Sequence, residues 1–230
     1  SRGKNLSSLF NREPMISWQP KKMQAALARA KHISDAGAFV KKIIGRRRLS
    51  VKDLLGINDL SDQDISLIFE AAWFFKKLAV EQPGKKKFSI LKGFSIINFF
   101  CEDSTRTRSS FELAGKHLGA DTINVTASGS SMSKKGETLN DTARTLNKLA
   151  ADCIIVRDKH ALAPAMIAKE ISAPVINAGD GWHEHPTQAL LDAFTMLEEF
   201  GSVTGKTIAV VGDVLHSRVA GSLLRITERL

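Results

Sequence analysis

The fold class follows from residues 94–119, which read FSIINFFCEDSTRTRSSFELAGKHLG. The apolar run at 94–101 has the length of a β-strand, and its nearly continuous apolar character indicates burial on both faces. A stretch with helix-forming residues follows at 107–117 and ends at Gly119, a residue type that often terminates helices. The segment therefore predicts a buried strand, a polar loop and a helix.

The same alternation continues to the end of the chain. Further strands are expected at residues 122–125, 153–156, 174–178 and 207–212, and further helices at 138–149, 161–171, 186–200 and from 217 onward. Strands that alternate with helices predict right-handed crossovers and a parallel sheet flanked by helices. The expected fold class is therefore α/β.

Helices are also expected before the first strand. Apolar residues recur at helical spacing over 19–33, and Ser61-Asp62-Gln63-Asp64 resembles a capping box that opens a helix over 61–78. At the other end, the strand and helix at 207–230 have no further strand to pair with. We therefore expect three parts: a basic N-terminal extension with a helix (1–48), an α/β domain (49–198) and the beginning of a second, truncated α/β domain (199–230).

Composition limits the classes of protein. The 230 residues are 43% hydrophobic and 25% charged, and the net charge is +9. The excess of basic residues lies within residues 1–48, which suit either a solvated helix or contact with nucleic acid. No apolar run reaches the roughly 18–20 residues that span a bilayer, and the N-terminus shows no signal-peptide pattern. We expect a cytoplasmic protein in which Cys101 and Cys153 are reduced thiols.

The loop Ser104-Thr105-Arg106-Thr107-Arg108 is the first candidate site. Hydroxyls, guanidinium groups and unpaired backbone N–H groups meet at the beginning of the expected helix, where the helix dipole is positive. All of these groups are donors, so the pattern favours a phosphate or a similar dianion. The alternative is an ordinary Ser/Thr cap followed by two surface arginines.

Two other loops follow expected strands. The segment from Ser131 to Thr138 is small, polar and basic, with Lys135 near its centre, and suits either a loop that closes over an anion or a solvated loop. Arg157 comes directly after the strand at 153–156, which favours either a site residue or a surface ion pair.

The fourth loop contains His183, His185 and Gln188. A His-x-His pair can bind a metal, but no third ligand is placed by the sequence. A neutral histidine that donates to a carbonyl oxygen, with Gln188 adding an amide, is the favoured interpretation. The alternative is that one histidine caps the helix that begins at Pro186.

Four segments resemble the aspartate/ornithine carbamoyltransferase family, most closely its aspartate-specific catalytic chains. In order, they are residues 100–112 (FCEDSTRTRSSFE), 133–138 (SKKGET), 177–192 (from NAGDG through HPTQALLD) and 211–220 (VGDVLHSRVA). The resemblance covers about residues 50–230. It implies that 49–198 is a carbamoyl-phosphate-binding domain followed by the start of an amino-acid-binding domain.

The resemblance also implies roles for individual residues. Arg106, Thr107, Arg157 and His185 would be catalytic. Carbamoyl phosphate would contact Ser104, Thr105, Arg106 and Thr107 through its phosphate, and Arg157, His185 and Gln188 through its carbamoyl end. Ser131 and Lys135 would reach the active site of a neighbouring subunit in a homotrimer or a larger assembly, and Arg218 would bind a carboxylate of L-aspartate.

The implied reaction is carbamoyl transfer from carbamoyl phosphate to L-aspartate in pyrimidine biosynthesis, without a metal or an organic cofactor. A carbamoyltransferase for ornithine or another amino acid is one alternative. A non-catalytic paralogue or fragment that acts as an interaction subunit is another.

Overall fold

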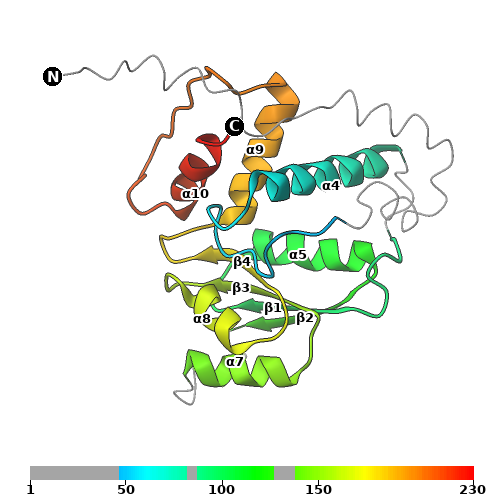
Figure 1. Cartoon of the computed structure of the whole chain (residues 1–230). Helices are drawn as coiled ribbons and strands as arrows, with labels where there is room; N and C mark the ends of the chain where they lie inside the picture. The colour runs from blue at the N-terminus through cyan, green and yellow to red at the C-terminus, as the bar shows by residue number, and fades with distance from the viewer. Residues whose placement is uncertain (1–46, 82–86, 127–137) are drawn as a thin grey trace.

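A computed structural model describes residues 47–81, 87–126 and 138–230 (Figure 1). The helix expected at 19–33 and the candidate residues Ser131 and Lys135 lie outside these described residues.

The described residues contain a four-stranded parallel sheet. The strands are β1 (Ser95–Phe100), β2 (Asp121–Thr126), β3 (Cys153–Asp158) and β4 (Val175–Asp180), in the order β2-β1-β3-β4. Ile97 of the central strand β1 pairs with Ile123 on one side and with Ile154 on the other. The predicted α/β class is confirmed.

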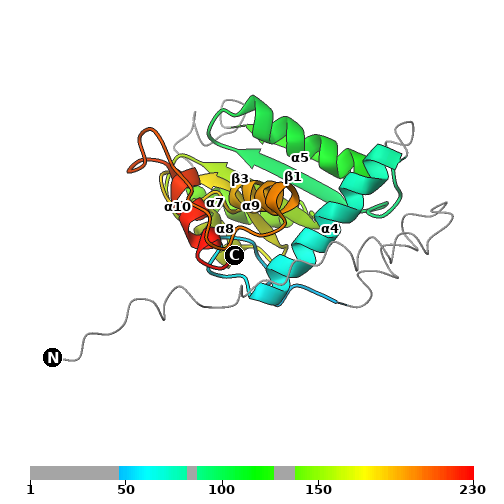
Figure 2. The same cartoon turned by 90° about the horizontal axis from the view of Figure 1, so that it is seen from above.

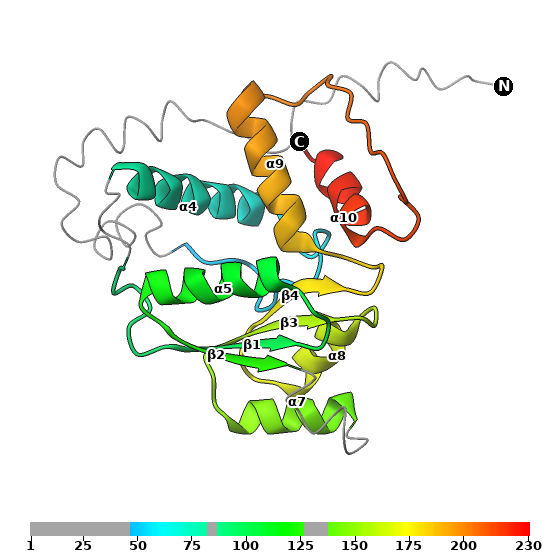
Figure 3. The same cartoon turned by 180° about the vertical axis from the view of Figure 1, so that it is seen from behind.

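Helices cover both faces of this sheet, as Figures 1 and 3 show. The helices α7 (Leu139–Lys148) and α8 (Ala163–Glu170) lie on one face, and α5 (Thr105–Leu118) lies on the other. Side chains of β1 alternate accordingly: Ile97 and Phe99 belong to the core beneath α7 and α8, whereas Ile96 and Phe100 belong to the core beneath α5.

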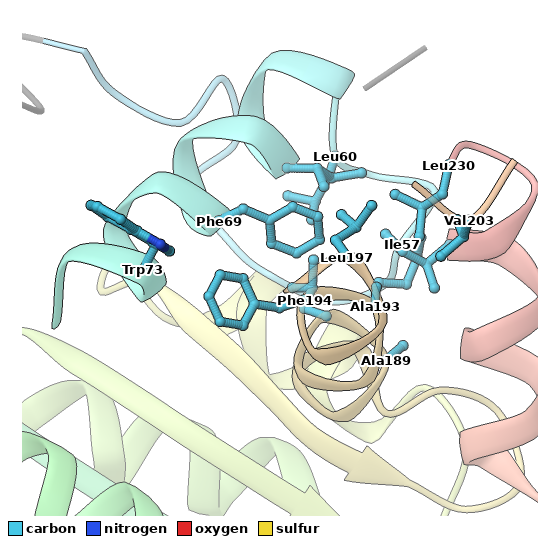
Figure 4. Close-up of a cluster of buried hydrophobic side chains, with 13 residues drawn as sticks. Ile57, Leu60, Phe69, Trp73, Ala189, Ala193, Phe194, Leu197, Val203 and Leu230 are labelled. Atoms are coloured by element: carbon cyan, nitrogen blue, oxygen red, sulfur yellow. The ribbon is translucent and has the colours of Figure 1, made fainter. Parts of the chain in front are cut away.

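A further core forms between α4 (Asp62–Glu81), α9 (Pro186–Phe200) and α10 (Arg218–Thr227). Figure 2 shows α9 between α4 and α10, and Figure 4 shows the side chains that meet there. The rings of Phe69 and Phe194 lie 5.9 Å apart, and Ile226 of α10 is fully buried. Burial of a side chain of this size contributes about 2–3 kcal/mol, so this cluster holds α10 firmly against the rest of the domain.

The capping box that was predicted at the start of α4 is confirmed. Ser61 Oγ accepts from the backbone N–H of Asp64 at 3.1 Å, and Asp64 Oδ2 accepts from the backbone N–H of Ser61 at 2.9 Å. Burial raises the pKa of Asp64, but hydrogen bonds from Ser50 and Ser61 outweigh it and lower this pKa to about 2.

The strand predicted at 207–212 is wrong. These residues form no strand and are exposed, and Val211 is 95% exposed. The β-branched sequence favours a strand, but a strand also needs a neighbour for its backbone N–H and C=O groups. No described strand lies beside this segment. The predicted helix after it does form, with Ser217 as its N-cap.

The strand order determines where a site can form. From β1 the chain turns to β2 on one side and later returns to β3 on the other side of β1. Loops that follow β1 and β3 therefore diverge and leave a crevice at the carboxyl ends of these strands.

Among the helices in the described part of the chain, none is long and apolar enough to cross a membrane.

Candidate active site

A cavity of about 790 Å³ opens at this carboxyl edge of the sheet. Its lining comes from α5, from the first parts of α9 and α10, and from β3. The predicted site residues that line it are Ser104, Arg106, Thr107, Arg157, His185, Gln188 and Arg218. Thr105, the first residue of α5, is exposed and is not among the residues that line the cavity.

The beginning of α5 lines the end of the cavity where the sequence predicts an anion site. Ser104 is the N-cap in an extended conformation, and its hydroxyl accepts from the backbone N–H of Thr107 at 3.4 Å. The first turn contains no acidic residue. The predicted cap and the predicted anion site are therefore compatible. Ser104 satisfies one N–H group, while the positive helix end and Arg106 still line the cavity.

Arg157 joins three parts of the site. Its Nη1 lies 3.5 Å from Thr107 Oγ1 and donates to the carbonyl oxygen of Ala178 at 3.3 Å, and its Nη2 donates to Glu102 at 2.6 Å. Its side chain is 12% exposed, and its Nε is buried without a hydrogen-bond partner among the described residues. Arg157 does form an ion pair, which was one of the two alternatives from the sequence, but the pair with Glu102 lies inside the site and not on an open surface.

Glu102 is a central residue that the sequence reasoning missed. Its carboxylate accepts from Arg157 and also accepts two hydrogen bonds from Arg218, at 2.5 and 2.9 Å. Burial raises the pKa of Glu102, but the hydrogen bonds from Arg218 and Arg157 outweigh it and hold this pKa below its ordinary value. One feature of the sequence could have identified Glu102, namely its position shortly after β1. Arg157 was predicted from the same kind of position, directly after an expected strand.

His185 is buried and electrically neutral at neutral pH. Burial, followed by the positive charges of Arg157 and Arg218, lowers its pKa to about 4. Its backbone N–H donates to Ser222 Oγ at 2.8 Å, and its ring Nδ1 lies 3.4 Å from Thr187 Oγ1. His185 occupies the N-cap position of α9, but its side chain makes no capping hydrogen bond.

The two histidines of the His-x-His pair have separate surroundings. His183 Nδ1 lies 3.0 Å from Asp180 Oδ2, whereas the ring of His185 faces Thr187. The described residues contain no group of three or more His, Cys, Asp or Glu side chains that is placed to hold a metal ion. This pair therefore has no third ligand in the described part of the chain.

Gly179 allows the cationic side chains to approach His185. A Cβ atom at this position would lie 3.3 Å from each of three atoms: Arg157 Nη1, Arg218 Nε and His185 Cδ2. Gly179 also has a φ of +113°, which residues with a side chain rarely adopt. The backbone is fixed there because its N–H donates to Asn177 Oδ1 at 2.8 Å. Glycine is thus required both for space and for conformation.

A second cavity, of about 520 Å³, adjoins the first and shares Arg218 and Val219 with it. Lys159, Trp182 and His216 are among its lining residues, and the rings of Trp182 and His216 lie 4.4 Å apart. The two adjacent cavities offer room for two polar molecules, with Arg218 between them.

The cysteines do not contribute a nucleophile to this site. Cys101 and Cys153 are free thiols, and burial is the main reason that their pKa values are raised to about 12 and about 11. Both remain protonated at neutral pH, so neither supplies a thiolate.

Curated proteins with similar sequences indicate the family of this chain. The aspartate carbamoyltransferase catalytic subunit of Acidiphilium cryptum is 53% identical over 177 residues, which are 77% of this chain and 56% of that protein. The corresponding subunit of Cytophaga hutchinsonii is 54% identical over 75% of this chain and 55% of its own length. This chain thus spans about half the length of these curated relatives.

The fold of this chain is also similar to that of solved structures with the same kind of name. Aspartate transcarbamoylase from Trypanosoma cruzi, crystallised with carbamoyl phosphate, aligns with a TM-score of 0.71 and 36% identity over 77% of this chain and 54% of that chain. Residues 52–198 match the family described as aspartate/ornithine carbamoyltransferase, carbamoyl-P binding domain. This match covers more than half of the sequence, and we conclude that the chain belongs to the aspartate/ornithine carbamoyltransferase family.

Proposed function

We propose that this chain carries the carbamoyl-phosphate site of an enzyme that transfers the carbamoyl group of carbamoyl phosphate to L-aspartate. The products are N-carbamoyl-L-aspartate and phosphate, and the reaction belongs to pyrimidine biosynthesis. The observation that supports this proposal most directly is the convergence of a helix N-terminus, three guanidinium groups and a neutral histidine on one cavity. The names of the curated relatives favour aspartate over ornithine as the acceptor.

The beginning of α5 would bind the phosphate. The N–H groups of the first helical turn and the guanidinium of Arg106 offer several donors to phosphate oxygens. Ser104, which lines the same end of the cavity, would add its hydroxyl.

Thr107, Arg157 and His185 would surround the carbonyl oxygen of the carbamoyl group. Negative charge grows on this oxygen when the amine attacks, so donors fixed in advance stabilise the transition state more than the ground state. Removal of one such donor typically lowers kcat by about 10²- to 10³-fold. His185 would act as a neutral donor, because its lowered pKa keeps the ring uncharged. Gln188 would contact the carbamoyl amide.

Arg218 would bind a carboxylate of L-aspartate at the junction of the two cavities. The amine nitrogen then forms a bond to the carbamoyl carbon, and the bond from this carbon to the phosphate oxygen breaks. The electron pair of that bond leaves with phosphate, which can also accept the proton that the nitrogen loses. Holding the two substrates side by side removes much of the entropic barrier to this step.

We also propose that the protein acts as a homotrimer or larger assembly in the cytoplasm, with no metal or organic cofactor. The family resemblance supports this assembly, because it implies that Ser131 and Lys135 reach the active site of a neighbouring subunit.

Binding and product assays test the proposed function. Carbamoyl phosphate and phosphonoacetate should each give heat in titration calorimetry with the chain, and R106A should abolish that heat. Incubation with carbamoyl phosphate and L-aspartate should give carbamoylaspartate, whereas ornithine should give no citrulline. The absence of both heat and product would overturn the proposal, and citrulline as the main product would change the acceptor.

A further inference from the structure

The two edges of the His185 ring face different surroundings. The Nδ1 edge faces Thr187, whose Oγ1 lies 3.4 Å away. The opposite edge carries Nε2 and Cδ2. A Cβ atom at Gly179 would lie 3.3 Å from Cδ2, from Arg157 Nη1 and from Arg218 Nε alike. The Cδ2 side of the ring therefore lies near Gly179, which both guanidinium groups also approach, and the charges of Arg157 and Arg218 act on the ring.

A neutral imidazole carries one proton, on either Nδ1 or Nε2, and the other nitrogen is then an acceptor. Two guanidinium groups near the Cδ2 side of the ring favour a lone pair on Nε2, the nitrogen bonded to Cδ2, because a lone pair attracts positive charge. This tautomer would direct an acceptor at the incoming carbonyl oxygen. Polarising that oxygen requires the opposite tautomer, with the proton on Nε2.

We propose that Thr187 is a positioning residue that holds His185 in its Nε2–H tautomer by donating its hydroxyl proton to Nδ1. Thr187 is the second residue of α9, where the nearby backbone N–H groups of the first turn are donors rather than acceptors. Within the described part of the chain, the hydrogen-bond partner of Thr187 Oγ1 is His185 Nδ1. A hydroxyl proton directed at Nδ1 leaves the ring proton on Nε2.

This inference extends the proposed function and rests on it for its catalytic consequence. With the proton on Nε2, His185 joins Arg157 and Thr107 as a third donor around the carbonyl oxygen. Without the Thr187 hydroxyl, the guanidinium charges favour the tautomer that has its lone pair on Nε2. His185 then presents an acceptor to the carbonyl oxygen instead of a donor. The expected loss then falls on kcat more than on the KM for carbamoyl phosphate, because the charge on the oxygen is greatest in the transition state.

Nitrogen-15 NMR of the ligand-free chain with ¹⁵N-labelled histidine tests the tautomer directly. Long-range ¹H–¹⁵N correlations distinguish the two neutral tautomers, and H185Q assigns the signals of His185 by their loss. We expect the Nε2–H pattern in wild type and in T187S, which keeps the hydroxyl. T187V, which keeps the shape without the hydroxyl, should shift His185 toward the Nδ1–H pattern; T187A replaces it if the valine variant does not fold.

An Nδ1–H tautomer in the wild type, or an unchanged pattern in the variant that lacks the hydroxyl, would overturn the assignment. Turnover is the second readout: T187V should lower kcat by about 10- to 100-fold with little change in KM, and T187S should restore it. The NMR result does not depend on activity. A wild-type chain without turnover would thus refute the proposed function and leave the tautomer assignment to be decided by the spectra.

Discussion

Glu102 and Arg218 are 116 residues apart in the sequence, and they form a two-pronged ion pair at the centre of the site. Glu102 follows β1, whereas Arg218 is the first residue of α10. The same carboxylate binds Arg157, so one anion holds two of the cations that line the cavity.

Replacement of Glu102 by glutamine should have opposite effects on binding and turnover. E102Q keeps the shape of the side chain but removes its charge, so the cavity becomes more positive and should bind inorganic phosphate several-fold more tightly. Turnover should fall by about tenfold, because Arg218 loses its anchor. Calorimetry and product assays measure the two effects. E112Q, which changes a glutamate of α5 that does not line the cavity, is the control. Weaker phosphate binding by E102Q would contradict the expectation.

Replacement of Arg106 by alanine should remove the proposed phosphate contact without changing the fold. Arg106 is exposed toward the cavity, so its loss leaves no buried charge unpaired. We expect kcat to fall by at least about 100-fold, with an unchanged thermal transition. R108A alters the same helix two residues later, outside the residues that line the cavity, and should retain most activity. Similar losses in the two variants would argue against a specific phosphate contact.

The space at Gly179 gives a third prediction. G179A should displace Arg157, Arg218 or His185, because its Cβ would lie 3.3 Å from each, and should also strain the backbone. We expect about 1–3 kcal/mol lower stability and a loss of turnover greater than about 100-fold. G205A separates the two causes, because Gly205 has a similar positive φ of +73° but open space around it. Normal activity in G179A, measured with its unfolding curve, would show that the site tolerates the methyl group.

The lowered pKa of His185 predicts how stability depends on pH. The unfolded chain has a histidine pKa of about 6.5, whereas the folded protein holds it at about 4. Between these values the unfolded state binds more protons, so acidification from pH 6.5 to pH 4 should lower the free energy of unfolding by about 3 kcal/mol through this residue. Denaturant unfolding of wild type and H185Q at several pH values measures the difference. A difference that stays constant over this range would exclude a depressed pKa.

Much of the fold was predictable because local and global signals agree. The periodic apolar runs gave all four described strands and the helices between them, and Ser61 and Asp64 identified the start of α4. The strand at 207–212 could not be judged from its residues, since strand formation also depends on a neighbouring strand. The same dependence on context leaves the boundary at residue 199 a prediction.

Candidate site residues could be predicted from the sequence where the side-chain chemistry suits only one kind of partner. Donor groups identified Arg106 and His185, because an anion or a carbonyl oxygen needs donors, whereas Arg157 was identified by its position directly after a strand. Glu102 escaped this reasoning because an acid does not suit an anion site until the cations that it binds are known, and the partner Arg218 is remote in the sequence. The spacing of Thr187 from His185 gave no signal until the ring orientation was known.

The bridge from Glu102 to Arg218 makes the binding pocket depend on segments that lie far apart in the chain. Its walls come from distant stretches of one polypeptide, so a fragment without α10 would lack one of its cations. Any anion that occupies the assembled pocket then favours the folded state by mass action, by about 2.7 kcal/mol at a concentration about 100 times its Kd. Substrate supply would in this way help to set how long the protein survives proteolysis in a cell.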